Sequence, residues 1–241
     1  MSTDDKATLA ILERGEITIT GEFLWGSNYT FAVEVKDEAG KLPAVYKPTR
    51  GERPLWDFPR ASLARRETAA YLVSEALGWR LVPPTVYRED GPLGPGSLQL
   101  YIEHDPENHY FNFTPEERQR LRPVVLFDLL INNADRKGSH VLIDRENHLW
   151  LIDHGICFHR EDKLRTVIWD FSGEPIPEAL CSALGDLERR LAPGNELFNL
   201  LKRYLSRDEI EALKMRARRL VSSGRFPNPH PNRRPYPWPP I

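Results

Sequence analysis

The sequence predicts an α+β fold of two lobes, the first rich in strands and the second mainly helical. The N-terminal third contains short alternating or β-branched segments, typical of strands, at residues 17–20, 29–36 and 42–47. A loop rich in Gly and Pro at 91–96 precedes a further strand at 97–103, which leads out of the first lobe. Beyond it the pattern is helical, apart from one hairpin. The expected divisions are a strand-rich N-lobe at 1–103, a helical C-lobe at 104–225 and a proline-rich tail at 226–241.

The bulk composition is that of an ordinary globular protein. Hydrophobic residues make up 40% and charged residues 28% of the 241 positions, enough for two lobes that share a cleft. The formal net charge of -2 gives no bulk attraction to nucleic acid, which we do not expect as a partner. The chain has only two cysteines, a polar and acidic start, and no apolar run near the length of about 18 residues that a membrane span needs. We therefore expect a cytoplasmic protein without a signal peptide or membrane span.

A helix is predicted at 60–78 in the N-lobe, closed by Gly78. Its apolar positions fall on one face, and Glu67 lies on that same face. A carboxylate that faces a packed interior needs a cationic partner, because an unpaired buried charge is costly. Lys47, at the end of the preceding strand, is the candidate partner; the alternative is that both side chains are solvated.

Two capping boxes mark helices in the second half of the chain. Thr114 and Glu117 form the first box, which opens a helix whose apolar core at 124–131 predicts burial on most sides. That helix is expected to end at Asn132, so the polar loop after it would start from a rigid element. Ser206 begins the second box. The remaining helices are expected at 177–191, 196–205 and 206–222.

The segment 132–155 carries the most informative pattern. An Asp-Arg pair at 135–136 is followed by two short apolar runs joined at 145–148, which predict a β-hairpin, and then by Asp153. The hairpin would bring Asp135 and Asp153 close in space although they are far apart in sequence. Kinase-type phosphoryl transfer uses such a pair, one carboxylate to orient the attacking hydroxyl and one to hold the metal on the phosphates.

The segment 21–28 joins the first two predicted strands and ends in Gly26, Ser27 and Asn28. Such a loop offers backbone N–H groups to an anion such as a phosphate. A plain hairpin turn explains the same residues equally well, so both interpretations stay open.

Together these features resemble the protein-kinase-like fold, in the form found in the phosphatidylinositol 3-/4-kinase group and the related HipA-type bacterial kinases. The resemblance covers about residues 17–205 and extends to bacterial proteins labelled phosphatidylinositol-kinase-like, which share the blocks at 46–48 and 51–59. The segment 21–28 lacks the Gly-x-Gly-x-x-Gly pattern of the protein kinases proper. The resemblance implies a kinase that uses ATP with Mg²⁺ or Mn²⁺ and moves the γ-phosphate to a hydroxyl on a protein or small molecule.

The resemblance also implies roles for individual residues. Lys47 would contact the nucleotide phosphates, and Glu67 would hold it in place. Asp135 would orient or deprotonate the acceptor hydroxyl, while Asp153 would bind the metal that bridges the β- and γ-phosphates. Further nucleotide contacts would come from Gly26, Ser27 and Asn28 over the phosphates and from the backbone of Gln99, Tyr101 and Ile102 against the adenine.

One position departs from the kinase pattern. Five residues after the catalytic Asp, where kinases place an Asn as second metal ligand, this chain has His140. An imidazole nitrogen is softer than an amide oxygen and favours manganese or zinc more than an all-oxygen site does. His140 would bind the second metal or hydrogen-bond a phosphate oxygen, which leaves the preferred metal open.

Two other functions compete with the kinase. The run His140, Asp144, His148, Asp153 and His154 indicates a metal-dependent hydrolase, although the hairpin would place Asp144 and His148 away from Asp153. The second competing function is a scaffold that binds nucleotide without catalysis, because the presence of the key residues is no proof of turnover. Among acceptors, a protein or small molecule ranks above a phosphoinositide, since the chain shows no broad basic or apolar membrane-facing surface. Transfer of AMP in place of phosphate is also open.

The segment 226–241 is dominated by Pro and cannot form a helix or a central strand, because Pro lacks the amide donor. We predict an extended tail of the polyproline type. It is either an extended arm that packs along the protein's own fold or is partly disordered, or a partner-binding motif, and we favour the first of these two interpretations.

Overall fold

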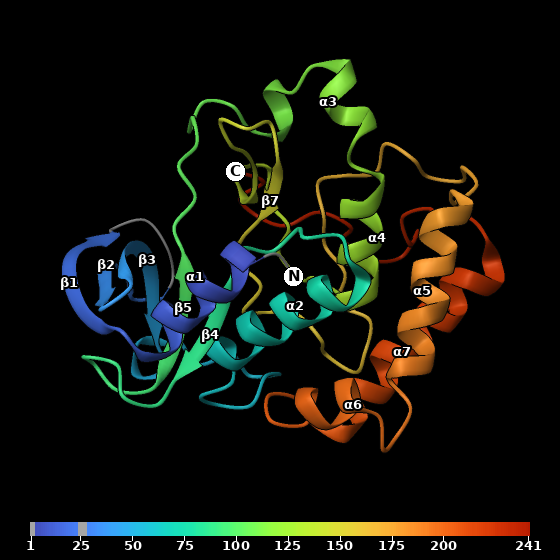
Figure 1. Cartoon of the computed structure of the whole chain (residues 1–241). Coiled ribbons are helices and arrows are strands. Elements are labelled where there is room, and N and C mark those ends of the chain that lie inside the picture. The colour runs from blue at the N-terminus through green and yellow to red at the C-terminus, as the bar shows by residue number, and fades with distance from the viewer. Residues whose placement is uncertain (1–2, 24–27) are drawn as a thin grey trace.

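The computed structural model describes residues 3–23 and 28–241, and it has the predicted α+β arrangement of a strand-rich lobe and a helical lobe (Figure 1). The N-lobe contains a five-stranded sheet in the order β1-β2-β3-β5-β4, in which every neighbouring pair is antiparallel. Its elements are α1 (Thr3–Arg14), β1 (Glu16–Phe23), β2 (Thr30–Asp37), β3 (Gly40–Pro48), α2 (Leu63–Leu77), β4 (Thr85–Arg88) and β5 (Gly96–Leu100). The three predicted strands of the N-terminal third are confirmed.

Helix α1 and strand β4 are additions to the predicted elements. The last turns of α1 carry Ile11 and Leu12, which are buried in the apolar core of the sheet with Val35 and Tyr46. Arg88 at the end of β4 donates to the Leu12 carbonyl at 2.9 Å and so fixes the end of the helix. The helix therefore completes the core of the small lobe.

Strand β5 ends at Leu100, three residues before the predicted end of the strand. Leu100 is opposite Ala44 in the last pair with β3, and the Tyr101 amide then donates to the Pro43 carbonyl at 3.0 Å. Pro43 of β3 accepts this bond but has no amide to donate in return, so the pairing of the two strands ends here.

Helix α2 ends at Gly78, which adopts the left-handed conformation with φ 69° that closes helices. Its predicted apolar face is buried at Leu63, Ala70, Val73 and Leu77. Arg66, which is 1% exposed, donates to the Cys157 carbonyl at 2.6 Å and forms an ion pair with Glu209 of the last helix. The N-lobe helix is thus fixed to the C-lobe directly beside Glu67.

The C-lobe is built around α4 (Arg122–Ile131), most of whose residues are buried. The predicted single helix from Thr114 to Asn132 is wrong in one respect, because it is divided into α3 (Pro115–Gln119) and α4. Pro123 explains the break. It lacks the amide that a continuous helix would need, yet it is tolerated in the first turn of a new helix.

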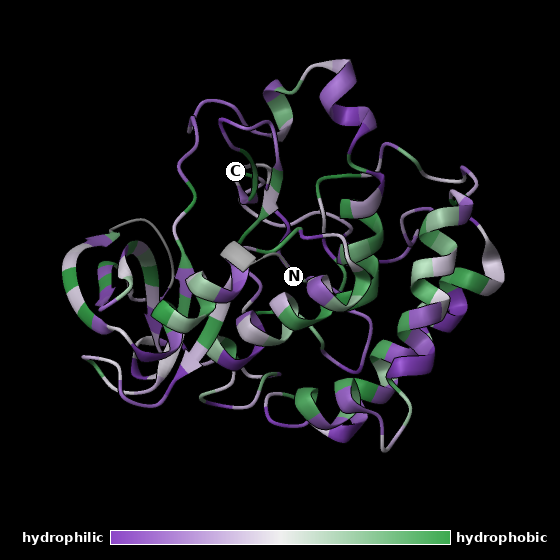
Figure 2. Cartoon of the chain, viewed as in Figure 1, coloured by the Kyte–Doolittle hydropathy of each residue, from purple (hydrophilic) through white to green (hydrophobic). Residues whose placement is uncertain are grey.

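Three further helices complete the C-lobe, of which α7 packs against α4 and α5 packs against α7. In Figure 2 α5 and α7 show hydrophobic and hydrophilic faces, as expected for an outer layer. The three helices are α5 (Glu178–Arg190), α6 (Glu196–Leu201) and α7 (Arg207–Ser223). Both predicted capping boxes are formed, at Thr114 and at Ser206. Among the described residues, none of the helices has the length and apolar character needed to cross a membrane.

The predicted hairpin is confirmed as β6 (Val141–Ile143) and β7 (Leu149–Leu151), which pair antiparallel. The Ile152 amide donates to the His140 carbonyl at 3.2 Å, so the residues before β6 and after β7 lie side by side. The hairpin thereby brings the Asp135 loop and Asp153 to the same end of the two strands.

The tail at 226–241 runs along the C-lobe. Phe226 is buried in the large core, the Thr166 amide donates to the Pro235 carbonyl at 2.9 Å, and the Gly138 amide donates to the Pro240 carbonyl at 2.8 Å. In Figure 1 the C-terminus lies beside β7. The end of the chain is therefore in contact with the loop that carries Asp135.

Candidate active site

Lys47, at the end of β3, forms ion pairs with two carboxylates. Its Nζ lies 2.5 Å from Oε1 of Glu67 on α2 and 2.9 Å from Oδ1 of Asp153 after β7. The Glu67 side chain is 4% exposed, and its Oε2 accepts the amide of His154 at 2.8 Å. The expected pair of Lys47 and Glu67 is thus formed, and the same carboxylate also fixes the backbone next to Asp153.

The charges of this cluster support one another. Burial disfavours the Lys47 ammonium, but the carboxylates of Asp153 and Glu67 outweigh that effect and raise the pKa of the lysine. The Lys47 ammonium is in turn the main cause that lowers the pKa of Asp153. Both groups are therefore charged at neutral pH.

Asp153 has an unusual backbone conformation and an accessible side chain. Its φ is 62°, in the left-handed region that residues with a side chain seldom adopt and that is often found at functional sites. The side chain is 49% exposed, so that one half of it remains available to a ligand although Lys47 is bound to it.

Arg136 is completely buried and ties the two halves of the site together. Its Nε lies 3.0 Å from Oδ2 of Asp128 in α4, and both side chains are 0% exposed. Its Nη1 donates to the carbonyls of His140 at 3.1 Å and Ile152 at 2.9 Å, and its Nη2 to Nε2 of His154 at 2.9 Å. One guanidinium thus holds the loop after α4 against the residues on both sides of Asp153.

Two asparagines shape the start of this loop. Asn132 closes α4 in the left-handed conformation with φ 56°. Asn133 donates to Asp128 Oδ1 at 3.1 Å and accepts the amide of Asp135 at 2.9 Å through its Oδ1. The backbone of Asp135 is therefore fixed at the end of a buried helix, as the sequence predicts.

The carboxyl group of Asp135 is influenced by its burial and by the charges around it, including that of Asp153. Burial raises its pKa from 3.8 to about 6, the ammonium of Lys137 at 3.8 Å opposes that change, and the charge of Asp153 adds to it. A carboxylate whose pKa is raised in this way is a better acceptor for the proton of an attacking hydroxyl.

His140 lies between the loop and Asp153. Its Nε2 is 3.4 Å from Oδ2 of Asp153, and its buried Nδ1 has no hydrogen-bond partner among the described residues. Burial lowers the pKa of the imidazole to about 4, so the ring is neutral at pH 7. A neutral imidazole beside a carboxylate is able to share a cation with it.

The predicted phosphate loop is described only in part. Gly26 and Ser27 lie outside the described residues. Asn28 lies at the start of β2, where its Oδ1 accepts the amide of Arg53 at 2.6 Å. The side chain of Asn28 thus connects this strand to the segment after β3.

The predicted adenine contacts lie where the chain passes between the lobes. Gln99 is within β5, and its side chain donates to the hydroxyl of Thr85 at 2.8 Å. The Tyr101 amide donates to the Pro43 carbonyl. The Ile102 amide makes no backbone hydrogen bond within the described residues, so it is the most available donor of the three positions.

The residues that would form a hydrolase site are separated by the hairpin. Asp144 at the turn accepts the His148 amide at 2.8 Å and the indole nitrogen of Trp150 at 2.7 Å, and the His148 ring contacts the Arg80 carbonyl. Asp144 and His148 therefore shape the turn, whereas Asp153 is at the other end of the strands.

Arg136 and Asp128 are site residues that the sequence analysis misses. Asp128 is a single charge inside an apolar helix, so the argument that assigns a partner to Glu67 applies to it as well. Arg136 gives no such signal, because an Arg in a polar loop is usually exposed. Its role is visible only from the structure.

The fold is shared with solved structures, among them two that are named as kinases. The chain matches the Golgi casein kinase with Mn/ADP bound at a TM-score of 0.58 and 15% identity, over 92% of this chain and 76% of that one. It matches hydra Fam20 with sugar at 0.55 and 16%, over 93% and 89%. It matches the proinflammatory kinase CtkA of Helicobacter pylori at 0.54 and 12%, over 89% and 94%. The protein therefore has a protein-kinase-like fold.

The sequence also matches two curated proteins. It is 40% identical to Protein Rv2133c of Mycobacterium tuberculosis (strain ATCC 25618 / H37Rv), over 95% of this chain and 94% of that protein, and it belongs to the same family. It is 28% identical to phosphatidylinositol 4-kinase gamma 4 of Arabidopsis thaliana, over 44% of this chain and 23% of that protein. No protein-family model matches the chain.

Proposed function

We propose that this protein is an ATP-dependent phosphotransferase that moves the γ-phosphate to a hydroxyl group of a protein or small molecule. The observation that carries the proposal is the cluster in which Lys47 bridges Glu67 and Asp153. Kinase-type transfer needs a cation on the phosphates, a metal-binding carboxylate and a carboxylate for the acceptor hydroxyl. Lys47, Asp153 and Asp135 supply these three groups.

Each residue has a defined task in this proposal. Lys47 binds the nucleotide phosphates, and Glu67 keeps its ammonium in position through their ion pair. Asp135 orients the acceptor hydroxyl and takes up its proton. Arg136 is a positioning residue, since it reaches the reacting groups only through the backbone of the loop and of Ile152. The segment Gly26, Ser27 and Asn28 and the segment Gln99, Tyr101 and Ile102 would contact the phosphates and the adenine.

The donor set fits a metal ion that arrives with the nucleotide. Asp153 and His140 would hold it, and Mg²⁺ commonly takes only one or two protein ligands together with substrate phosphates. Among the described residues there is no group of three His, Cys, Asp or Glu side chains that would bind a metal alone. When bound, the metal supplies positive charge that neutralises the phosphates. The Mn/ADP complex of the Golgi casein kinase supports this pairing of nucleotide and metal.

The comparisons support a kinase and do not select one class of acceptor. Two of the structural neighbours are named as kinases, and one of these is a casein kinase. The similarity to a phosphatidylinositol 4-kinase, over less than half of the chain, supports the predicted kinship to phosphatidylinositol kinases without defining a lipid substrate. The kinship to HipA-type kinases stays a prediction from the sequence.

The proposal is tested by incubating the protein with γ-labelled ATP, Mg²⁺ or Mn²⁺ and a cell extract, and then identifying the labelled molecules. The matched control is Asp135→Asn, which removes the proton acceptor and leaves the ion pairs of Lys47 in place. We expect labelling by the wild type and its loss in the variant. Equal labelling by both proteins would contradict the proposed role of Asp135.

His140 favours one second candidate, a scaffold that binds nucleotide without turnover, because it replaces the amide of the kinase pattern. The scaffold predicts that ATP with metal raises the melting temperature, and that the rise grows with the logarithm of ligand concentration once the site is nearly saturated. It also predicts that no transfer to protein, lipid or metabolite depends on Asp135. The two candidates therefore agree on binding and differ on transfer.

A further inference from the structure

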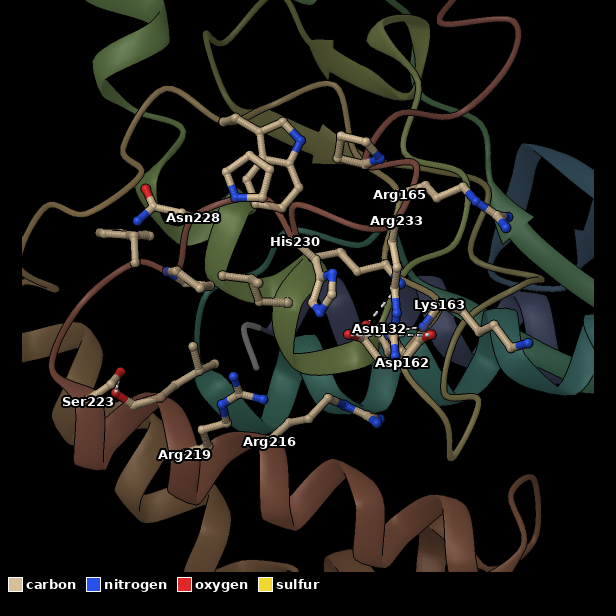
Figure 3. Close-up of a pocket in the computed structure, with 18 of the residues that line it drawn as sticks. Asn132, Asp162, Lys163, Arg165, Arg216, Arg219, Ser223, Asn228, His230 and Arg233 are labelled. Atoms are coloured by element: carbon tan, nitrogen blue, oxygen red, sulfur yellow. Dashed lines mark hydrogen bonds and ion pairs between the residues drawn. The ribbon is translucent and has the colours of Figure 1, made fainter.

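A hollow lies between α7, the segment 160–165 and the tail at 226–235 (Figure 3). We call it the α7–tail cavity, and its volume is about 1310 Å³. Lys47, Glu67, Asp135 and Asp153 are not among the residues that line it. Figure 3 shows Arg216, Arg219 and Ser223 on α7 at one side, with His230 and Arg233 of the tail across from them.

The lining of this cavity is strongly basic although the whole chain carries a net charge of -2. Nine lining residues are Arg or Lys, and Asp162 is the one acidic lining residue among those described. Asp162 is itself paired with Arg233 at 2.9 Å. Within the described chain, five of the basic side chains have no carboxylate partner: Arg165, Arg216, Arg219, Arg225 and Arg234. The cavity therefore has a surplus of positive charge.

Two hydrogen-bond donors on its wall have no partner. Arg216 is held by the carbonyls of Leu130 at 2.7 Å and His159 at 3.3 Å, yet its buried Nη2 makes no hydrogen bond with the described residues. The buried indole nitrogen of Trp169 also makes no hydrogen bond with the described residues. Buried donors without an acceptor are costly, and a bound ligand with acceptor oxygens would satisfy both of them.

The rest of the wall is apolar. It includes Trp169, Leu220 and four prolines of the tail, at 227, 229, 231 and 235. An inorganic anion would leave this apolar surface in contact with water, whereas a ligand with an apolar body would cover it. The volume also exceeds the range of about 300–1,000 Å³ that is common for small-molecule pockets.

We propose that the α7–tail cavity binds an organic phosphate, with a phosphate or diphosphate head on the arginines of α7 and an apolar or aromatic body against Trp169 and the tail prolines. The shared chemistry is found in prenyl diphosphates and in nucleotides. The occupant contacts the tail, α7 and the segment 160–165 together, so it fixes the tail on the C-lobe. The site stands independently of the proposed function, because Lys47, Glu67, Asp135, His140 and Asp153 are not part of its lining.

Calorimetric titration in EDTA tests the site with three probes: inorganic pyrophosphate, farnesyl diphosphate and ADP. Arg219→Glu reverses a charge in the lining, and Arg207→Glu makes the same change on the exposed first residue of α7, outside the cavity. We expect one organic probe to bind more tightly than pyrophosphate, and its affinity to fall by about tenfold or more in Arg219→Glu and by less than about twofold in Arg207→Glu. Trp169→Phe, which removes the indole donor and part of the ring surface, should give a smaller loss.

The probes separate the possible sources of the ligand. Tighter binding of farnesyl diphosphate indicates a lipid-type phosphate, and tighter binding of ADP indicates a nucleotide, provided that Arg219→Glu weakens it. The bound probe should also slow tryptic cleavage after Arg233. The proposal is overturned if no probe binds, if both charge reversals have equal effects, or if pyrophosphate binds as tightly as the organic probes. ADP that binds equally to the wild type and Arg219→Glu occupies another site and counts as an absence of binding to this cavity.

Discussion

The Lys47 cluster and the Arg136 cluster are neighbouring groups of cation and carboxylate, and they differ in what they leave open. Arg136 and Asp128 are both 0% exposed, and the guanidinium uses its donors on acceptors within the protein. Lys47 is 23% exposed, and the Asp153 carboxylate beside it is 49% exposed. The hydrogen-bonding groups of the Arg136 cluster are occupied by the protein itself, whereas the Lys47 cluster retains capacity for a ligand.

Because of this difference, the two clusters have separate roles although both pair a cation with a carboxylate. A buried pair that has all its hydrogen bonds fixes the position of the segments it joins, and breaking it leaves a charge without compensation. An accessible pair with a raised lysine pKa and a lowered aspartate pKa keeps both charges ready for an ionic ligand. We therefore expect changes at Arg136 to affect folding first and changes at Lys47 to affect nucleotide binding first.

The largest effect is expected from Arg136→Met. It leaves the carboxylate of Asp128 buried without a cation, so the free energy of unfolding should fall by about 3–5 kcal/mol. Urea denaturation measures this loss. The control is Arg165→Met, an exposed side chain nearby, which should change stability by less than about 0.5 kcal/mol. Similar losses in both variants would show that the buried pair has no special role.

Lys47→Met should have a smaller effect on folding and a complete effect on binding. It leaves Glu67 buried without a cation, a change we expect to cost about 1–3 kcal/mol of unfolding free energy. The rise in melting temperature that ATP with Mg²⁺ or Mn²⁺ gives to the wild type should disappear. A variant that keeps the full rise would remove Lys47 from the nucleotide site and end the contrast between the clusters.

Asp135→Asn should stabilise the folded protein at high pH. The pKa of the carboxyl is raised from 3.8 to about 6, so the folded state disfavours the carboxylate relative to the unfolded chain. This penalty is absent at pH values below about 4 and develops as pH rises through about 6. At pH 8 we expect the variant to melt about 2–4 °C above the wild type. Melting curves between pH 4 and 8 check this, and a constant difference across that range would contradict the assigned pKa.

His140→Asn should give the smallest effect. It restores the amide that kinases carry at this position and removes the softer imidazole nitrogen next to Asp153. We expect nucleotide binding to shift by about a few-fold toward Mg²⁺ relative to Mn²⁺, with little change in stability. Titrations with each metal in turn measure the ratio, and an unchanged ratio would mean that His140 does not bind the metal.

Much of the fold follows from local sequence patterns. The strands before Pro48, the helix that ends at Gly78 and both capping boxes are each encoded in a short segment, and each is found. Helix α1 differs, because its first turns are polar and its apolar contacts with the core of the sheet come from Leu9, Ile11 and Leu12 near its end. Its formation depends on packing against distant strands, which periodicity within the segment does not reveal.

The candidate site likewise contains some residues that the sequence predicts and others that only the folded structure reveals. The partner of Glu67 could be predicted, because a carboxylate on an apolar face requires a cation and Lys47 is the nearest one in the pattern. Asp128 offers the same clue within α4, but its partner Arg136 lies in a polar loop and is buried only by the folded C-lobe. The α7–tail cavity has no local pattern at all, since its arginines come from α7, a loop and the tail.

The most direct test of the central claim is a calorimetric titration of ATP with Mn²⁺ and with EDTA into the wild type, Asp135→Asn and Asp153→Ala. If Lys47, Asp135 and Asp153 share one nucleotide site, Asp135→Asn should bind like the wild type, with an affinity that depends on the metal. Asp153→Ala should lose that dependence. The same metal-dependent affinity in Asp153→Ala as in the wild type would contradict the shared site.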